Sequence, residues 1–312
     1  MGRLPLVANE MFNIQFLEKS MLAVELEPTT VSVCDIDAVD TITPQSFKRD
    51  YIDTNTPLLM RKVTASWPAM QKWSFDFFAN LSLPKRVFLE MNNVLQGSGQ
   101  YEVMEYGDYI RRMADEDSGQ PAPKGYLSVF KVFTAFPELA NDVDFSLLSQ
   151  FKLKNTPKGW IGPAGTVTGY HVDWGDNVLA QICGRKEVRL VAPADSKYMY
   201  PSQRFDQGTL SSELDVDNYD AQRFPLFEKA TEYRIIIQPG EMLFIPRGWW
   251  HHVRSLDKSI SVSNIGYDAK GIVVDLLSER VKQVLHDVGL YRVPCTCHIE
   301  HNGKRMRRAV AN

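Results

Sequence analysis

Residues 160–186 decide both the fold and the chemistry, and they read Trp-Ile-Gly-Pro-Ala-Gly-Thr-Val-Thr-Gly-Tyr-His-Val-Asp-Trp-Gly-Asp-Asn-Val-Leu-Ala-Gln-Ile-Cys-Gly-Arg-Lys. Near the middle of this stretch, His171 is followed by Val172 and Asp173. Successive side chains of a strand point to opposite faces, so His171 and Asp173 share a face while Val172 takes the other. The spacing therefore predicts an imidazole and a carboxylate that point inward together.

A second histidine, His251, follows a long apolar segment. From Arg234, an apolar run, a Pro239-Gly240 turn and a second apolar run ending at Pro246 predict a β-hairpin. Such a hairpin would deliver His251 to the mouth of a barrel.

Two imidazoles and one carboxylate are the ligand set of non-haem Fe(II) sites, which cover one face of an octahedral ion and leave three positions open. The predicted metal ligands and catalytic residues are His171, Asp173 and His251. Each half is weak alone, because His-x-Asp pairs are common by chance and a buried histidine is more often a core residue. Both halves at strand ends, in the right order, favour a metal site in an oxygenase.

Length and composition indicate one globular domain. A chain of 312 residues with 44% hydrophobic and 23% charged residues can bury a large core, and β-barrels with added helices commonly form single domains. Residues 188–191 and 235–237 are the clearest strands. No apolar run approaches the roughly 20 residues of a membrane span. Residues 1–7 lack a long apolar region, so we expect no signal peptide and no membrane partner.

Charge and cysteine content suggest a compartment and a partner class. A net charge of -3 argues against a nucleic acid as the main partner, since positive charge concentrates only at 304–308, which we expect to be a solvated end. Four cysteines without a disulfide framework predict a reducing, intracellular location, nuclear and/or cytoplasmic.

A zinc site near the C-terminus stays open on sequence grounds. Its four candidate ligands are Cys295, Cys297, His298 and His301. So many borderline or soft ligands within seven residues are unusual, yet adjacent Cys297 and His298 can hardly both reach one tetrahedral ion without strain.

Local signals predict several helices. Thr43-Pro44 resembles an N-cap followed by proline, which would open a helix through Tyr51. A strand is expected at 57–63, and helices are expected to begin at 73–74 and to span 106–114. Between 268 and 288, apolar residues fall at helical spacing and Gly289 acts as a stop. A stripe of this kind usually packs on its own barrel, and a homodimer through this helix stays open.

The stretch 160–186 closely resembles the core of JmjC-domain 2-oxoglutarate oxygenases, and the likeness extends over residues 43–263. Further segments that share it are 67–74, 125–127, 136–139, 215–218, 224–227 and 239–246. Within the family the nearest likeness is to the small JmjC-only protein hydroxylases, in particular the member described both as an arginyl hydroxylase and as a lysine demethylase.

The resemblance implies a mainly β fold, a double-stranded β-helix of jelly-roll or cupin type with flanking N- and C-terminal α-helices. It divides the chain into three parts. These are an N-terminal extension (1–42), the oxygenase domain (43–266, with a barrel core of about 125–266), and a C-terminal helix with a basic tail (267–312).

The resemblance also implies Fe(II) and the cosubstrate 2-oxoglutarate, and it assigns cosubstrate residues. Lys186 matches the lysine that pairs with the distal carboxylate, and the other matching positions are Thr168, Tyr126 and Asn177. Arg185 and Lys186 alternate faces, so only one of them can point inward. The metal ligand directly follows the residue aligned with Trp250, which selects His251 over His252.

The leading functional hypothesis is hydroxylation of a side chain in a protein or peptide substrate, arginine-type favoured, with release of succinate and CO₂. At least one indole among Trp174, Trp249 and Trp250 is expected beside the open metal positions, where an aromatic wall can hold a cationic side chain. The alternatives are a tRNA-base hydroxylase of the wybutosine type, a histone lysine demethylase and, least favoured, a non-catalytic binding module. Hydroxylases and demethylases use the same iron site, so the sequence does not choose between them.

Overall fold

The structure is a computed structural model that describes residues 32–93, 95, 100–115, 123–206, 208–295, 298–301 and 304–307. Its strands are β1 (Ser32–Cys34), β2 (Asp37–Val39), β3 (Leu58–Met60), β4 (Arg86–Glu90), β5 (Tyr101–Glu105), β6 (Leu127–Phe130), β7 (Lys154–Gly162), β8 (Val167–Asp173), β9 (Asp176–Cys183), β10 (Lys186–Val191), β11 (Thr209–Ser211), β12 (Thr231–Ile237), β13 (Met242–Ile245), β14 (Trp250–Ser255), β15 (Ser259–Tyr267), β16 (His298–His301) and β17 (Lys304–Arg307).

The helical elements are short except for two. They are α1 (Pro44–Phe47), η2 (Lys48–Ile52), α2 (Ala69–Lys72), α3 (Phe75–Ala79), α4 (Tyr106–Ala114), α5 (Val132–Ala135), η3 (Pro137–Asp142), α6 (Ser146–Ser149), η4 (Pro193–Tyr198), η5 (Pro225–Lys229), η6 (Gly271–Leu276) and α7 (Leu277–Asp287). Among the described residues, none of these helices is long and apolar enough to span a membrane.

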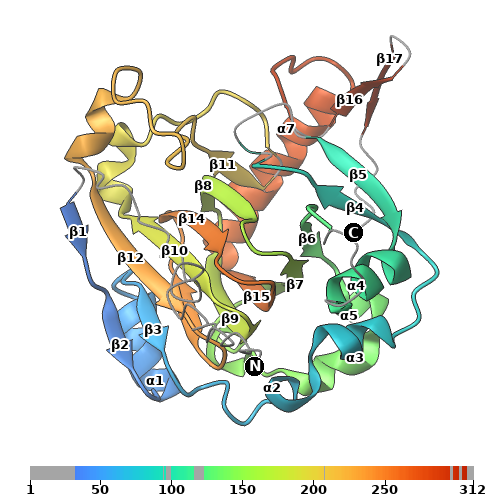
Figure 1. The fold of residues 1–312 in the computed structure, drawn as a ribbon. Coiled ribbons are helices and arrows are strands. Elements are labelled where there is room, and N and C mark those ends of the chain that lie inside the picture. Colours follow the sequence, from blue (N-terminus) through green and yellow to red (C-terminus); the bar gives the residue numbers. More distant parts are fainter. Residues whose placement is uncertain are drawn as a thin grey trace, which may run out of the picture. The chain divides into compact units, whose positions relative to one another are not determined.

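Two facing β-sheets form the body of the fold (Figure 1). One has the order β1-β12-β10-β14-β8-β11, and the other has the order β2-β3-β13-β9-β15-β7-β6. From β7 to β10 and again from β12 to β15, the chain passes from one sheet to the other at each connection. This alternation is the winding of a jelly roll, so the predicted mainly β, cupin-like fold is confirmed.

The predicted hairpin between 234 and 246 is wrong. Strand β12 pairs with β10 and β1, whereas β13 pairs with β9 and β3 in the opposite sheet. The Pro239-Gly240 turn is present, with Gly240 at φ 94°, but it carries the chain across the barrel. Turn residues specify where a chain reverses but not which strand it pairs with afterwards. The sequence therefore predicted pairing between two apolar runs that lie in different sheets.

Side chains fill three layers. Leu179 and Leu243 from one sheet pack against Val188 and Leu190 from the other, which makes this cluster the interior between the sheets. The outer face of the seven-stranded sheet packs on α1 to α6, with Phe47 and Phe78 among the fully buried side chains. The outer face of the six-stranded sheet is covered by the segment between β10 and β12. The sheet that carries the candidate ligands is therefore buried on both faces.

Three predicted helices are present. Helix α4 spans 106–114 as expected, and α3 begins after Ser74, whose Oγ accepts from the Phe77 N–H at 3.0 Å. Thr43 caps α1 through a 3.2 Å bond from the Ser46 N–H. The helix expected through Tyr51 is present, and after one turn of α1 it continues without a break as the π-helix η2, which ends at Ile52.

The apolar stripe of the C-terminal helix does not pack on the barrel as expected. Val273, Leu277 and Val281 are each more than half exposed. The buried side chains of α7 are instead polar, namely Glu279, Gln283 and His286. His286 bonds the Tyr291 carbonyl at 2.6 Å, and its ring lies 5.1 Å from that of Phe205. The helix thus docks by its polar side, which hydrophobic periodicity does not predict.

Both ends of the described chain add strands. Strands β1 and β2 extend the edges of the two sheets by parallel pairing with β12 and β3. Strands β16 and β17 form an antiparallel ribbon where a solvated tail was expected.

The turn between β9 and β10 offers a stability test. Gly184 has φ 68°, and an added Cβ would lie 2.2 Å from the Lys258 carbonyl oxygen. Gly165 has φ 80° with nothing within 4 Å of an added Cβ. We expect Gly165→Ala to cost about 1–2 kcal/mol of unfolding free energy from backbone strain. Gly184→Ala should cost roughly 2 kcal/mol more, because backbone must also move.

Urea denaturation of the two variants measures this difference. Equal losses of unfolding free energy in both variants would contradict the role of the Lys258 contact.

Candidate active site

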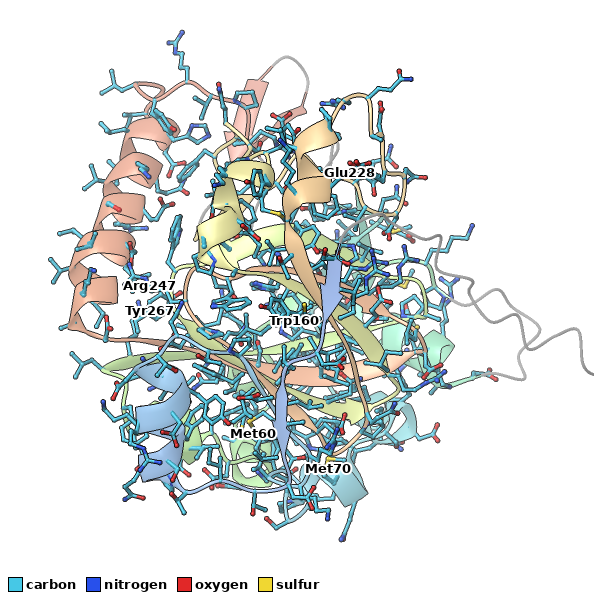
Figure 2. The ribbon with its side chains drawn as sticks, turned by 90° about the vertical axis from the view of Figure 1, so that its left-hand side faces the viewer. Met60, Met70, Trp160, Glu228, Arg247 and Tyr267 are labelled. Carbon is cyan, nitrogen blue, oxygen red and sulfur yellow. The ribbon has the colours of Figure 1, made fainter. Side chains whose placement is uncertain are left out.

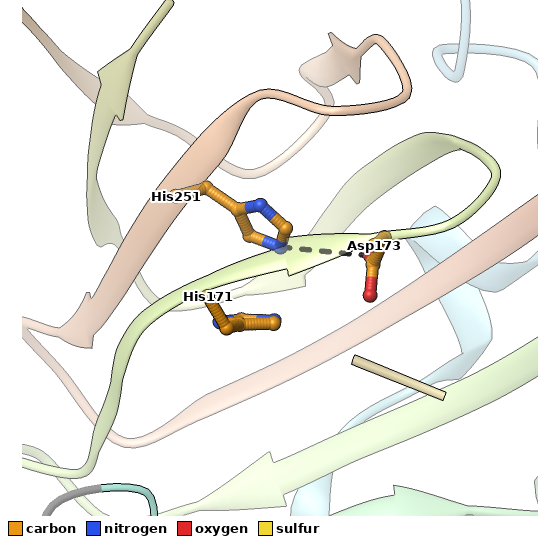
Figure 3. A group of neighbouring side chains, drawn as sticks. All are labelled: His171, Asp173 and His251. Carbon is orange, nitrogen blue, oxygen red and sulfur yellow. Dashed lines mark ion pairs between the residues drawn. The ribbon is translucent and has the colours of Figure 1, made fainter. Parts of the chain in front are cut away.

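His171, Asp173 and His251 come together on neighbouring strands β8 and β14 (Figure 3). One potential ligand atom from each residue lies within 4.8 Å of the other two. His171 and His251 are direct cross-strand partners, and Asp173 is two residues along the same face of β8. The His251 Nε2 atom is 3.5 Å from Asp173 Oδ2. The two imidazoles and the carboxylate therefore occupy one small volume, with the geometry of a facial triad.

Backbone carbonyls orient both imidazoles. His171 Nδ1 lies 2.8 Å from the Gly169 oxygen, and His251 Nδ1 lies 3.1 Å from the Trp249 oxygen. A ring whose Nδ1–H donates to a carbonyl presents Nε2 as a lone-pair donor. Burial, and secondarily the neighbouring His171, lowers the pKa of His251 to about 4, so this ring is neutral near pH 7. A neutral imidazole is the form that ligates a metal.

Asn177 holds the carboxylate in place. Its Nδ2 donates to Asp173 Oδ2 at 3.0 Å, while its Oδ1 is buried without a hydrogen-bond partner. A buried acceptor without a donor is costly, so Asn177 Oδ1 is a place where a bound group can be recognised.

Lys186 is a buried cation that faces inward. Lys186 is only 1% exposed, and its Nζ donates to the Tyr126 hydroxyl at 2.9 Å. Burial lowers its pKa to about 7, and no described carboxylate forms an ion pair with it. Arg185 instead points to solvent and pairs with Asp257 at 2.7 Å. The alternation predicted for these two basic residues is confirmed.

Thr168 joins the same face because of a register shift. His251 pairs with His171, but Val253 pairs with Thr168, so β8 has one residue more than β14 between these pairs. Paired residues share a face, and the extra residue places half-buried Thr168 inward, although it lies three positions from His171.

His252 points away from the triad. Its Nε2 lies 3.6 Å from Asp217 Oδ2 on the outer side of the sheet, and its ring lies 5.6 Å from that of Tyr170. The structure therefore selects His251 as the histidine that meets His171.

The tryptophans divide between the two faces of the sheet. Trp174 and Trp250 belong to the outer cluster, and Trp249 belongs to the inner one, where its Nε1 donates to the Asn55 carbonyl at 2.9 Å. The inward indole that sequence reasoning missed is Trp160 (Figure 2). Its ring is 6.2 Å from that of Tyr126, and its Nε1 donates to Ser263 Oγ at 2.8 Å. Trp160 is the first residue of the stretch 160–186. Strand alternation places it on the face opposite to Ile161, and this is the sequence signal that could have identified it.

A buried charge network behind the triad was also missed. The Tyr170 hydroxyl donates to Glu232 at 2.6 Å, and Arg189 pairs with Glu187 at 2.6 Å. Arg234 bonds the other oxygen of Glu232. These side chains lie on the outer face of the sheet that carries the ligands, and their mutual pairing is what makes burial of several charges tolerable.

The zinc hypothesis falls outside the described residues. Cys297 is not among them, and the side chains of His298 and His301 are not described either.

Comparison with known proteins agrees with this site. The model of the cupin-like domain family matches residues 44–270. Lysine-specific demethylase 8 of Xenopus tropicalis is 33% identical over 227 residues, which are 70% of this chain and 50% of that protein. Lysine-specific demethylase JMJ30 of Arabidopsis thaliana is 34% identical over 226 residues, or 70% of this chain and 52% of that protein.

A relative with a different name matches at a similar level. The tRNA wybutosine-synthesizing protein 5 of Gallus gallus is 29% identical over 249 residues, which are 73% of this chain and 76% of that protein. The chain spans about half the length of the two demethylase-named relatives. Since the family model covers the strands from β3 to β15 and both halves of the triad, this chain belongs to the cupin-like, JmjC-domain family of 2-oxoglutarate-dependent oxygenases.

Proposed function

We propose that this chain is an Fe(II)- and 2-oxoglutarate-dependent dioxygenase that hydroxylates a side chain of a protein substrate. The observation that carries the proposal is the triad of His171, Asp173 and His251 in the same barrel as the buried Lys186, which pairs with no carboxylate among the described residues.

The residues present fit both groups. Two imidazoles and a carboxylate suit Fe(II) better than Ca²⁺ or Mg²⁺, which prefer oxygen ligands, and better than a closed zinc site with four protein ligands. An ammonium buried with a hydroxyl as its hydrogen-bond partner lacks a counter-charge, and the distal carboxylate of 2-oxoglutarate would supply one. The unpartnered Asn177 Oδ1 marks a further polar position in the site.

When bound, iron and 2-oxoglutarate supply the O₂-dependent oxidation in which 2-oxoglutarate becomes succinate and CO₂. The protein contributes position and environment. Lys186, Tyr126 and Thr168 would hold the distal carboxylate, and Asn177 fixes the orientation of the Asp173 carboxylate. The apolar side chains of the inner cluster exclude water from the reacting groups.

For the substrate, we propose a protein side chain, with arginine favoured. Net charge -3 and a family likeness to protein-modifying enzymes support a peptide over a polyanion. The names of two relatives suggest demethylation of a lysine as an alternative reaction. The name of the third suggests hydroxylation of a tRNA base. A binding module without activity would not need the complete triad together with Lys186.

The test is to incubate the iron-loaded protein and 2-oxoglutarate with arginine- and lysine-containing peptide pools or with total tRNA. A mass increase of one oxygen atom on arginine peptides is the expected result. Loss of a methyl group from methyl-lysine peptides would favour demethylation, and an oxygen gained only by tRNA would move the assignment to the base hydroxylase. Location in a reducing, intracellular compartment stays a prediction.

Homodimerisation through the C-terminal helix, which the sequence left open, is a further proposal, and the exposed stripe of Val273, Leu277 and Val281 is the observation behind it. We expect light scattering to give about twice the 35.5 kDa chain mass for the unmodified protein and the single-chain mass for Val281→Glu. Lys282→Gln, on the flank of the same helix, is the control and should keep the larger mass. A single-chain mass for the unmodified protein would contradict the prediction.

A further inference from the structure

A second lysine, Lys158, faces the interior of the barrel. Two residues of β7 face outward. An added Cβ at Gly159 would contact Val132 outside the sheet, and Ile161 packs in the core on the outer face of the sheet. Trp160, between them, belongs to the inner cluster. Because side chains alternate along a strand, Lys158 shares the inward face with Trp160, where it is half-buried.

Pairing places Lys158 close to the level of the triad. Lys158 is the cross-strand partner of Ser263, whose Oγ accepts from the Trp160 indole. Ser263 in turn pairs with Leu179 on β9. Leu179 is two residues from Asn177, the residue that bonds Asp173. The ammonium is therefore carried by the wall opposite the metal-bearing sheet.

This cation has no partner within the described part of the chain. No hydrogen bond or ion pair is formed by its Nζ, and the neighbouring charged group is another cation, Lys131. Burial, with a smaller contribution from Lys131, lowers the pKa of Lys158, and no carboxylate offsets either effect. A half-buried charge beside a like charge destabilises the fold, so its presence on the inward face of the barrel indicates use in recognition.

We propose that Lys158 is a substrate-contacting specificity residue, which together with Lys131 takes a carboxylate of a peptide next to the residue that is oxidised. The proposal rests on the proposed function and specifies its substrate. The same charge would repel a cationic group, so an arginine or lysine target has to approach the triad from the side away from β7.

A peptide carboxylate fits better than a nucleic-acid phosphate. Two lysines form a small positive site, whereas a protein that binds a phosphate backbone usually presents an extended row of basic residues. The chain also carries a net negative charge. The cosubstrate is also a poorer candidate, because Lys186 already offers a buried cation with a hydroxyl beside it.

The experiment uses three matched fluorescent peptide pools around a central arginine, with Glu, Gln or Lys at the flanking positions. Binding to the protein is measured by anisotropy, and oxidation by mass spectrometry with iron and 2-oxoglutarate. Unmodified protein should bind the Glu pool with about tenfold higher affinity than the Gln pool, and it should bind the Lys pool with the lowest affinity of the three. Lys158→Met should abolish the preference, Lys158→Arg should keep it, and Lys158→Glu should invert it.

The two readouts separate this inference from the proposed function. Inversion of binding by Lys158→Glu without oxidation of any pool would support the inference and count against peptide hydroxylation. Oxidation with equal binding of all pools, or the same preference in Lys158→Glu, would overturn the inference. It would equally be overturned if Lys158→Met weakened 2-oxoglutarate binding as much as peptide binding, or if only tRNA binding responded to Lys158.

Discussion

Alanine in place of His171, Asp173 or His251 should abolish 2-oxoglutarate turnover. Each substitution removes one of three ligand atoms that lie within 4.8 Å of one another. Loss of an outer partner of a metal ligand typically costs about 10–100-fold in metal affinity or activity, so loss of a ligand itself should exceed that range. Succinate production and the iron content of the purified variants measure the two consequences independently.

The matched control is His252→Ala. His252 is as buried as His251, at 1% against 3% exposed, but it faces Asp217 across the outer side of the sheet. This variant should lose stability and keep its iron. Iron lost in His252→Ala but retained in His251→Ala would show that the register of β14 is wrong by one residue.

The register of the triad was predictable because it is local. A separation of two residues on a strand places His171 and Asp173 on one face whatever the strand pairs with. The same rule separated Lys186 from Arg185, and the structure shows Arg185 at the surface with Asp257. Features that depend only on the period of one strand can be read from sequence.

Features that depend on a partner strand could not be predicted in the same way. The chain crosses from one sheet to the other between β12 and β13, and this depends on which strands are free to pair with each of them. The Pro239-Gly240 turn alone is equally compatible with a hairpin. The inward position of Thr168 requires an extra residue in β8, which appears only when β14 is alongside. Strand alternation counted from His171 would place Thr168 on the opposite face, so the sequence pattern alone does not indicate this position.

The C-terminal helix shows the limit of hydrophobic periodicity. Its stripe was detected correctly, but periodicity reports which residues share a face and not where that face points. Burial of His286 and Gln283, through contacts such as the Tyr291 carbonyl, turns the stripe outward. The decisive contacts are polar and involve residues that follow the helix, so no pattern within the helix indicates them.

Replacing Lys186 with alanine should raise the 2-oxoglutarate requirement strongly. Removing one partner of a buried charge pair costs about 2–5 kcal/mol, because the distal carboxylate would then be buried without a counter-charge. Arg185→Ala is the control, since its pair with Asp257 is exposed and screened by solvent and does not face the barrel. Equal effects of the two substitutions on the concentration of 2-oxoglutarate that gives half-maximal succinate production would contradict the inward role of Lys186.

The depressed pKa of Lys186 adds a pH dependence with a defined sign. Burial lowers this pKa to about 7, so the ammonium that should meet the dicarboxylate is present below that pH and is lost as the pH rises through it. Binding above pH 7 then requires proton uptake, and affinity should fall by up to about tenfold per pH unit until the pKa of the bound form is reached. Lys186→Arg stays charged and should bind equally at about pH 6 and about pH 8. Equilibrium binding under anaerobic conditions measures both proteins, and an unmodified protein whose affinity did not fall over this range would show that Lys186 is not the group that meets the cosubstrate.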